Sequence, residues 1–338
     1  MTELSRRNAF SRRNLIVGTA AAAAGGALAP FAPSRARAAA AALGQQAPGF
    51  YRYKVGSIEI TVVTDGVSRF RFADDHVTNR SRDEVNAALA AAYFEKDMMT
   101  TPYNPVVVNT GSKLVVIDTG TGEANFARSK GVAGQFQMNL KAAGIDRNAV
   151  DLVVISHFHG DHINGLLTPD NKPAYPNAEI LVPAAEWKFF MDDGEMSRAP
   201  AGRMQEVFAN LRRVFDALGR KVTPYAPNTE VAPGITSVAT PGHTPGHNSH
   251  IVASGSAKVY VQADVTHVPW LFARHPDWHA FYDQDGQMAE ETRRKVYDML
   301  AAERMMVQGF HYPFPSLAYV EKTATGYREV PVPWNPTI

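Results

Sequence analysis

Four side chains that can bind a metal ion lie within six consecutive residues, in the segment HFHGDH at positions 157–162. This segment directly follows residues 152–155, a short apolar and β-branched run that predicts a buried strand. A buried imidazole or carboxylate needs a polar partner, and four of them together disfavour one another unless a cation gathers them. The cluster therefore predicts a metal site at the end of a strand, which restricts the folds open to this chain.

The spacing within HFHGDH suits two metal ions rather than one. Side chains alternate along an extended chain, so His157 and His159 point to the same side. The chain turns at Gly160, after which Asp161 and His162 can face a second point. One short loop can thus supply ligands to two neighbouring ions.

Three further candidate ligands follow other predicted strands in the same way. They are His243 after residues 235–239, Asp264 after residues 259–263, and His311 after residues 305–310. Because each lies just beyond the carboxyl end of a strand, the whole set can converge on one edge of the sheets. Five imidazoles and two carboxylates suit zinc and also permit cobalt, manganese or iron. The chain has no cysteine, which excludes thiolate ligands and a cysteine nucleophile.

Strands and helices alternate through the rest of the chain without an internal linker rich in Pro, Gly or Ser. The predicted elements include a strand region at 51–64, a helix from Ser81 to about 94, a hairpin at 106–118, and helices at 134–143, 203–218 and 287–302. This pattern predicts one α/β domain over residues 49–338, with two packed sheets and helices outside them.

Residues 1–38 have the composition of an export signal. Ser11-Arg12-Arg13-Asn14-Leu15-Ile16 resembles the bacterial twin-arginine motif, with a weaker copy at residues 5–7. The Ala- and Gly-rich run that follows is too weakly apolar for a stable membrane span, and Ala36-Arg37-Ala38 suits signal peptidase. We expect cleavage near residue 38, a linker at 39–48, and a periplasmic or secreted protein that uses the twin-arginine machinery and has no permanent membrane anchor.

The charge balance gives no support for a nucleic-acid partner. Six of the 34 basic residues lie within the first 38 positions, beside one of the 33 acids, so the remainder carries a net charge of about −4. No basic stretch resembles a nucleic-acid-binding face.

HFHGDH is similar to the HxHxDH signature of the metallo-β-lactamase superfamily, and the later His, Asp and His occur in that family's order. Within the superfamily the chain resembles methyl-parathion-hydrolase-like enzymes and N-acyl-homoserine-lactone lactonases. The resemblance implies an αβ/βα sandwich of two mixed β-sheets with helices on the outer faces. It also implies two ligand sets and a shared residue: His157, His159 and His243 for one metal, Asp161, His162 and His311 for the other, and Asp264 bridging both.

Two divalent cations, with zinc as the first choice, would lower the pKa of a shared water and polarise the bond under attack. The expected reaction is attack of a metal-bridging hydroxide on a lactone or ester carbonyl, with Asp161 and Asp264 as the catalytic carboxylates. An organophosphate triesterase is the alternative, because the same site can attack phosphorus. A zinc-binding protein without turnover is the remote alternative.

The sequence says less about the substrate. We expect a small neutral ester, lactone or phosphotriester, and exposed apolar loops would suit a homodimer. His267 stands where related lactonases often place a Tyr that touches the substrate, and we predict that it contacts substrate. We also predict an apolar wall formed by Phe126, Trp187, Phe190 and Trp270. Among the other candidates, Asp118 and Asp65 are expected to orient ligand histidines, His247 to make a structural hydrogen bond, and His76 to lie on the surface.

Overall fold

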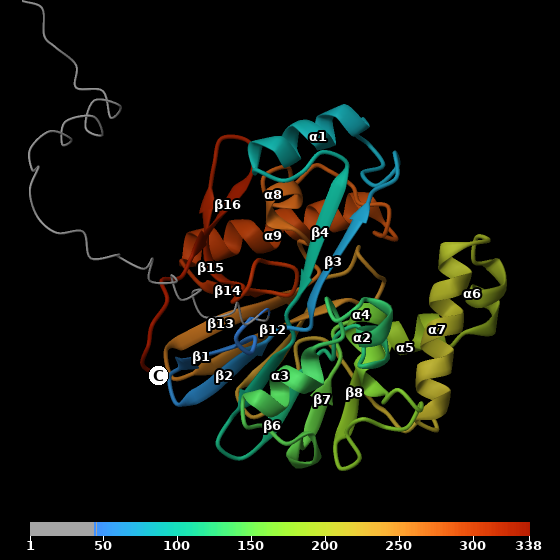
Figure 1. The fold of residues 1–338 in the computed structure, drawn as a ribbon, viewed down its shortest axis with the longest axis vertical. Helices are drawn as coiled ribbons and strands as arrows, with labels where there is room; N and C mark the ends of the chain where they lie inside the picture. The colour runs from blue at the N-terminus through green and yellow to red at the C-terminus, as the bar shows by residue number, and fades with distance from the viewer. Residues whose placement is uncertain (1–43, 45) are drawn as a thin grey trace, which may run out of the picture. The chain divides into compact units, whose positions relative to one another are not determined.

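The described chain folds around two seven-stranded β-sheets and one two-stranded ribbon (Figure 1). The structure is a computed structural model that describes residue 44 and residues 46–338, and Gln46–Ile338 form one compact unit. The predicted export signal at residues 1–38 lies outside the described residues, as does most of the predicted linker.

The first sheet combines antiparallel and parallel neighbours. The three junctions from β1 to β6 are antiparallel and the three from β6 to β9 are parallel. In spatial order its strands are β1 (Phe50–Val55), β2 (Ile58–Val63), β5 (Val106–Asn109), β6 (Leu114–Ile117), β7 (Leu152–Val154), β8 (Glu179–Pro183) and β9 (Thr223–Tyr225). The predicted hairpin is confirmed as β5 and β6, whose turn is closed by a hydrogen bond from Thr110 N to Lys113 O.

The second sheet is antiparallel except where β13 runs parallel to β14. Its strands follow their sequence order: β10 (Glu230–Ala232), β11 (Ile235–Ala239), β12 (Asn248–Ser254), β13 (Ala257–Ala263), β14 (Met306–Gly309), β15 (Leu317–Lys322) and β16 (Tyr327–Pro331). The separate ribbon pairs β3 (Gly66–Arg71) with β4 (Met98–Tyr103). Both large sheets are therefore mixed, as expected.

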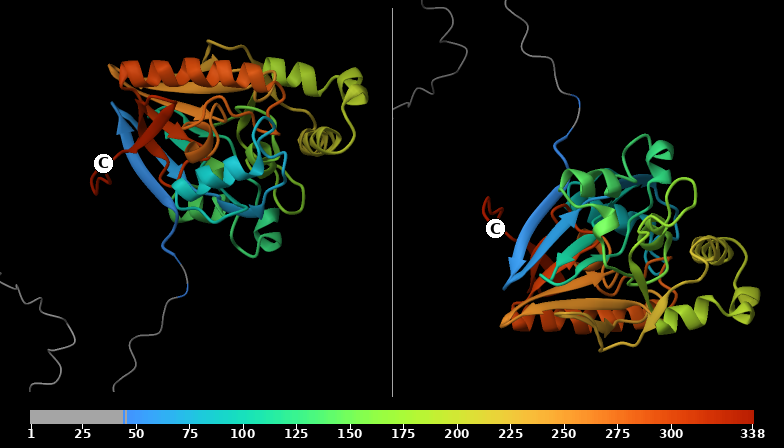
Figure 2. Two further views of the ribbon diagram at one scale, coloured as in Figure 1. Left: turned by 90° about the horizontal axis from the view of Figure 1, so that it is seen from above. Right: turned by 90° about the horizontal axis from the view of Figure 1, so that it is seen from below.

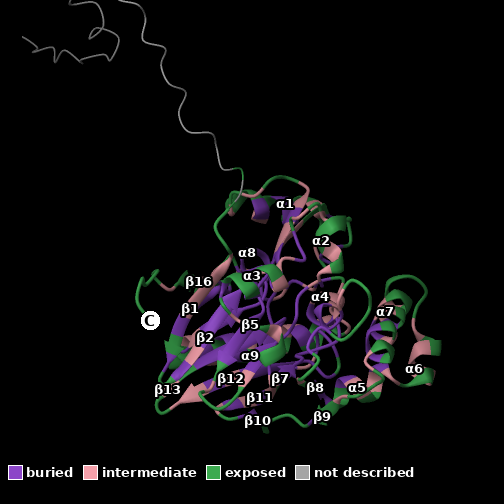
Figure 3. Ribbon diagram, turned by 60° about the horizontal axis from the view of Figure 1, so that its bottom comes forward, coloured by how far each residue is buried: buried purple, intermediate pink, exposed green. Residues whose placement is uncertain are grey.

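Alternate residues of the central strands enter different cores. On β6, Val115 and Ile117 face the core between the two sheets, where they meet Val259 and Val261 of β13. Val116 of β6 belongs instead to the core on the outer face of its sheet. Successive side chains of a strand point to opposite faces of the sheet, which explains both contacts. Because both faces are buried, the sequences of these strands are continuous apolar runs. Figure 3 shows the buried residues concentrated on these strands.

Some of the helices cover the outer faces of the two sheets. The described helices are α1 (Arg82–Ala91), α2 (Ala124–Arg128), α3 (Phe136–Ala142), α4 (Gly160–Ile163), α5 (Ala184–Phe190), α6 (Asp193–Arg198), α7 (Arg203–Ala217), α8 (Pro269–Phe272) and α9 (Gly286–Glu303). Residues of α3 and α7 pack on the first sheet, while α9 runs along the outer side of the second (Figure 2). The predicted helices at α1, α7 and α9 are confirmed, and Ser81 and Glu84 form the predicted capping box. Within the described residues, no helix has the length and apolar character needed to span a membrane.

Candidate metal centre

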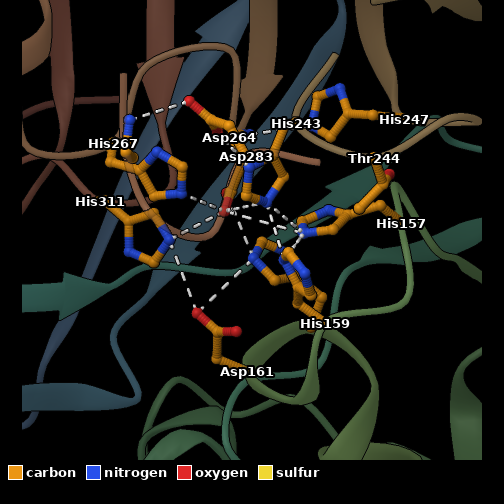
Figure 4. A network of polar contacts seen from close by, with 12 residues as sticks. His157, His159, Asp161, His243, Thr244, His247, Asp264, His267, Asp283 and His311 are labelled. Atoms are coloured by element: carbon orange, nitrogen blue, oxygen red, sulfur yellow. Dashed lines mark hydrogen bonds and ion pairs between the residues drawn. The ribbon is translucent and has the colours of Figure 1, made fainter. Parts of the chain in front are cut away.

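The candidate ligands lie where four strands end. His157 and His159 follow β7, His243 follows β11, Asp264 directly follows β13, and His311 follows β14. The chain after β7 continues into the short helix α4, which carries the remaining two candidates, Asp161 and His162. The structure brings all seven side chains together, and all are buried except Asp161, which is partly exposed (Figure 4).

The first group contains three imidazole nitrogens that point at one another. His159 Nδ1 lies 3.2 Å from His157 Nε2 and 2.7 Å from His243 Nε2. His157 Nε2 and His243 Nε2 are 3.2 Å apart. Asp264 Oδ2 completes the group at 3.4 Å from His243 Nε2 and 3.7 Å from His157 Nε2.

The second group shares the Asp264 carboxylate with the first. Asp161 Oδ2 lies 3.7 Å from His162 Nε2 and 3.5 Å from His311 Nε2. Asp264 Oδ1 is 3.2 Å from His162 Nε2, and Asp264 Oδ2 is 3.2 Å from His311 Nε2. One carboxylate therefore faces both groups, which is the geometry that a bridging ligand requires.

The donor atoms fit two metal ions better than they fit a hydrogen-bond network. Ligands at about 2.0–2.1 Å from a tetrahedral ion are separated by about 3.3 Å, close to the spacings within each group. His162 Nε2 and Asp264 Oδ1 are buried and have no hydrogen-bond partner among the described residues. Such groups are costly unless a cation satisfies them, so these residues fit a pair of divalent ions.

Hydrogen bonds to the opposite nitrogens orient four of the histidines. His162 Nδ1 contacts Asp118 Oδ2 at 2.8 Å, and His243 Nδ1 contacts Asp283 Oδ1 at 2.8 Å. His311 Nδ1 lies 2.7 Å from the carbonyl oxygen of Pro102, and His157 Nδ1 lies 3.0 Å from Ser156 Oγ. These contacts leave each Nε2 free to face the centre, as do the hydrogen-bond partners that orient ligand histidines in metal sites.

The protonation tendencies of these groups support cation binding. Burial, together with neighbouring imidazoles and Arg203, holds the pKa values of His157, His159 and His243 well below 6.5, so their lone pairs are available. Burial also opposes charge on His162, but the carboxylates of Asp264, Asp118 and Asp161 outweigh it and raise its pKa. Without an ion, a proton on His162 would supply the positive charge that the carboxylates attract.

Unusual backbone conformations place several of these residues. Ala263 and Asp118 adopt φ values of 50° and 59°, in the left-handed region that costs a non-glycine residue about 1–2 kcal/mol. Gly242 has a φ of 125°, and a Cβ there would lie 2.3 Å from the backbone nitrogen of Ala289. The chain thus uses a strained residue, Ala263, next to Asp264 and a position that only glycine can occupy, Gly242, next to His243.

The predictions for the polar residues His247 and Asp118 are confirmed, but the prediction for Asp65 is wrong. The structural role of His247 is confirmed: its Nε2 accepts a hydrogen bond of 3.0 Å from the backbone of Asp264, and its Nδ1 contacts Thr240. Asp118 contacts a ligand histidine as predicted, but Asp65 does not. Instead Asp65 accepts hydrogen bonds from Thr121 and from the backbone of Phe136, which tie its loop to α3.

A cavity of about 480 Å³ opens onto the candidate metal centre. His267 lines it and places Nε2 3.0 Å from Asp264 Oδ2, so that it also forms a group of possible metal ligands with Asp264 and His311. Its contact with substrate stays a prediction. The predicted apolar wall is not formed by the four aromatic residues named from the sequence. The cavity has other aromatic residues along it, namely Phe70, Tyr103, Phe158, Phe281 and Tyr282.

The four aromatic residues that were predicted to form the apolar wall lie elsewhere in the structure. Phe190 and Trp187 pack in the core beneath α7, and Trp270 stacks on Phe94 at a centroid distance of 4.2 Å. Phe126 lines a separate cavity of about 1160 Å³ beside α2 and α3, which contains none of the candidate ligands. Burial of Phe190, Trp187 and Trp270 stabilises the fold, whereas Phe126 is 40% exposed beside the other cavity.

Sequence reasoning missed the residues that approach the site from distant loops. Asp283, Phe281 and Tyr282 lie in an irregular segment before α9 and carry no motif. His76 was expected on the surface, but the structure buries it to 3% exposure along the cavity. The signal that the sequence offered for this loop was the adjacent Phe281-Tyr282 pair.

The chain is similar in sequence to a known protein family and to proteins of known activity. The family profile described as "Metallo-beta-lactamase superfamily" matches residues 99–296. An N-acyl homoserine lactonase from Bacillus sp is 22% identical over 218 residues, which are 62% of this chain and 77% of that protein.

Two solved structures are similar over most of both chains. One is described as "AidC, a Dizinc Quorum-Quenching Lactonase, in complex with a product N-hexnoyl-L-homoserine", with 26% identity, a TM-score of 0.78, and coverage of 85% of this chain and 98% of that one. The other is a hydrolase, AbOPH, in the beta lactamase superfamily, with 24% identity and the same TM-score, over 86% of this chain and 100% of that one. The expected fold class is confirmed.

Proposed function

Because this chain belongs to the metallo-beta-lactamase superfamily, we propose that it is a lactonase that uses two metal ions. Its membership of this superfamily and its similarity to lactonases identify it as a metal-dependent hydrolase of ester bonds. The observation that carries the finer proposal is the shared carboxylate of Asp264, which faces two separate groups of donor atoms beside an open cavity.

We assign one ion to His157, His159 and His243, and the other to Asp161, His162 and His311, with Asp264 as the bridge. The donor set contains only imidazole and carboxylate groups, so zinc is the proposed ion, with cobalt, manganese and iron as substitutes. Two bound divalent cations would lower the pKa of a water molecule between them and polarise the substrate carbonyl.

The protein's own residues provide orientation and proton transfer. Asp118 and Asp283 fix the rings of His162 and His243, so little reorganisation is needed during the reaction. Among the candidate ligands that line the cavity, Asp161 is the one that is partly exposed, and its second carboxylate oxygen makes none of the contacts drawn in Figure 4. We assign to this oxygen the proton that the attacking water would give up on adding to the carbonyl carbon, and Asp161 would pass this proton to the alkoxide that leaves when the ester carbon–oxygen bond breaks.

The test is hydrolysis of a substrate panel by the purified protein, before and after metal removal. The panel contains γ-lactones, aryl esters and a phosphotriester, since a site that attacks carbonyl carbon can also attack phosphorus. The proposal expects the highest kcat/KM on lactones and loss of that activity on chelation. A clear preference for the phosphotriester would make the chain an organophosphate hydrolase, and metal binding without turnover on any substrate would favour the non-catalytic alternative.

We also propose that the protein reaches the periplasm or exterior through twin-arginine export. The support is the Arg12-Arg13 motif and its weaker copy at Arg6-Arg7, all in the segment outside the described residues. Replacing the four arginines by Lys should leave precursor in the cytoplasm. Normal export of that variant would exclude this route.

A further inference from the structure

His311 lies in an irregular loop rather than in a strand or a helix. The loop, residues 310–316, joins the end of β14 to the start of β15, and Gly309 N donates to Ser316 O at 2.9 Å across its base. Asp161 and His162, which belong to the same ligand group, lie instead on α4. Contacts from other parts of the chain must therefore hold the backbone of His311 in place.

Asn104, the residue that directly follows β4, provides these contacts. Its backbone nitrogen and its side-chain Nδ2 both donate to the carbonyl of Phe310, at 2.9 and 3.1 Å. Nδ2 also donates to the carbonyl of Tyr312 at 2.7 Å. One buried amide thus holds the carbonyl groups of the residues on both sides of His311.

The end of β4 also fixes the ring of His311. The carbonyl oxygen of Pro102 lies 2.7 Å from Nδ1, and the ring of Tyr103 lies edge-on to the imidazole at a centroid distance of 5.6 Å. Three consecutive residues, 102–104, therefore determine both the backbone position and the ring orientation of this ligand.

Phe310 extends the effect of Asn104 to His162. The phenyl ring of Phe310 stacks on the imidazole of His162, with centroids 4.0 Å apart and planes inclined by 28°. A shift of the Phe310 backbone would move this ring against His162. The positions of both imidazoles of the second ligand group thus depend on the hydrogen bonds of Asn104.

The segment that carries Asn104 is attached to the first sheet. Val63 N, at the end of β2, donates to the carbonyl of Pro105 at 3.0 Å, and the carbonyl of Tyr103 accepts a hydrogen bond of 2.8 Å from the turn after β2. The proline also restricts the residue before it to an extended backbone. Asn104 therefore links the first sheet, from which α4 continues, to the loop of the second sheet that carries His311.

The side chain of Asn104 leaves one of its own polar groups unsatisfied. The residue is 2% exposed, and its Oδ1 is buried without a hydrogen-bond partner among the described residues. An unpaired buried acceptor lowers stability, so the hydrogen bonds made by the N–H groups must offset it. These N–H groups all point at the loop of His311, which indicates a role in holding this ligand.

We propose that Asn104 is a positioning residue for the metal centre. It sets the distance of His311 from the ligands on α4, and thereby the affinity for the ion assigned to Asp161, His162 and His311. This inference rests on the proposed function, because it uses the ligand assignment made there. The ion assigned to the other ligand group should not depend on Asn104, since the hydrogen bonds of Asn104 lead to the loop of His311.

The experiment titrates zinc into metal-free protein in competition with a chromophoric chelator, which resolves the two binding steps. Asn104→Leu keeps the approximate shape of the side chain but removes its N–H donors, and it should weaken one step by about tenfold or more and leave the other unchanged. Asp118→Asn identifies this step, because Asp118 orients His162. Asn104→Ser keeps one donor and should weaken the same step by about threefold, and it replaces the Leu variant if that variant does not fold.

Asn139→Leu is the matched control. Asn139 is another buried amide, 3% exposed, that accepts a hydrogen bond of 3.1 Å from Gly49 N and donates one of 2.8 Å to Thr64 O, and it hydrogen-bonds to none of the candidate ligands. Thermal unfolding of the metal-free proteins establishes that the compared variants are folded. Asn139→Leu should leave both zinc-binding steps as they are in the wild type.

The outcomes separate this inference from the proposed function. Wild-type protein that binds two zinc ions but hydrolyses no lactone would contradict the proposed function and leave the role of Asn104 intact. The inference is overturned if the folded Asn104 variants leave both steps unchanged or weaken both equally. It is also overturned if Asn139→Leu weakens the same step to the same extent.

Discussion

Removing the carboxylate of Asp283 should weaken metal binding at the group formed by His157, His159 and His243. Asp283 Oδ1 accepts a hydrogen bond of 2.8 Å from His243 Nδ1, and both side chains are almost fully buried, so solvent does not screen the interaction. A hydrogen bond to a charged group contributes about 1.5–3 kcal/mol, and a neutral acceptor gives roughly half of that.

These energies predict effects of different size for two substitutions of Asp283. Asp283→Asn keeps a neutral acceptor and should weaken metal binding about tenfold, whereas Asp283→Ala should weaken it by up to about a hundredfold. The fold should persist, because Arg293, the other partner of Asp283, retains hydrogen bonds to the carbonyls of Val265, Pro276 and Trp278.

The assay is competition with a chromophoric chelator, which resolves the two binding steps, combined with thermal unfolding of the metal-free protein. Asp118→Asn is the matched control, because Asp118 orients His162 in the other group. Asp283→Ala protein that unfolds normally and shows both binding steps unchanged would refute the orienting role of Asp283.

Three other changes have defined outcomes. Asp264→Ala should lower kcat much more than His247→Ala, because it removes the bridge itself rather than its backbone support; equal residual rates would mean that the bridge is misassigned. His267→Ala should change the ratio of lactone to phosphotriester hydrolysis with metal content intact; metal loss would instead identify His267 as a ligand. Burial raises the pKa of Glu186 to about 8 from 4.5, so the folded state holds a proton that the unfolded chain releases. Wild-type stability should therefore fall as the pH rises between these values, relative to Glu186→Gln, by a few kcal/mol in denaturant titrations; parallel pH profiles would contradict this.

The convergence of the candidate ligands could be predicted from the sequence because their positions follow from local rules. Each lies at or shortly after the carboxyl end of a predicted strand, and these ends meet at one edge of the sheets. The position of Asp118 could also be predicted from the sequence, because Asp118 ends the predicted hairpin beside β7. For these residues, secondary structure alone determines which side chains can converge.

The substrate cavity could not be predicted in this way. Trp187 and Phe190 lie on α5, and which side of that short helix faces a cavity depends on how α7 packs against it. His76 and Phe281 are about two hundred positions apart and meet only because their loops pair. Such contacts depend on tertiary packing, so the residue type alone does not distinguish an aromatic side chain in the core from one in the cavity.

The central claim is that one carboxylate serves two metal ions, and metal stoichiometry tests it most directly. Elemental analysis of fully active protein, purified without chelator and without added metal, should give about two divalent ions per chain, and Asp264→Ala protein should retain fewer. Full activity with one ion or less per chain would contradict the account.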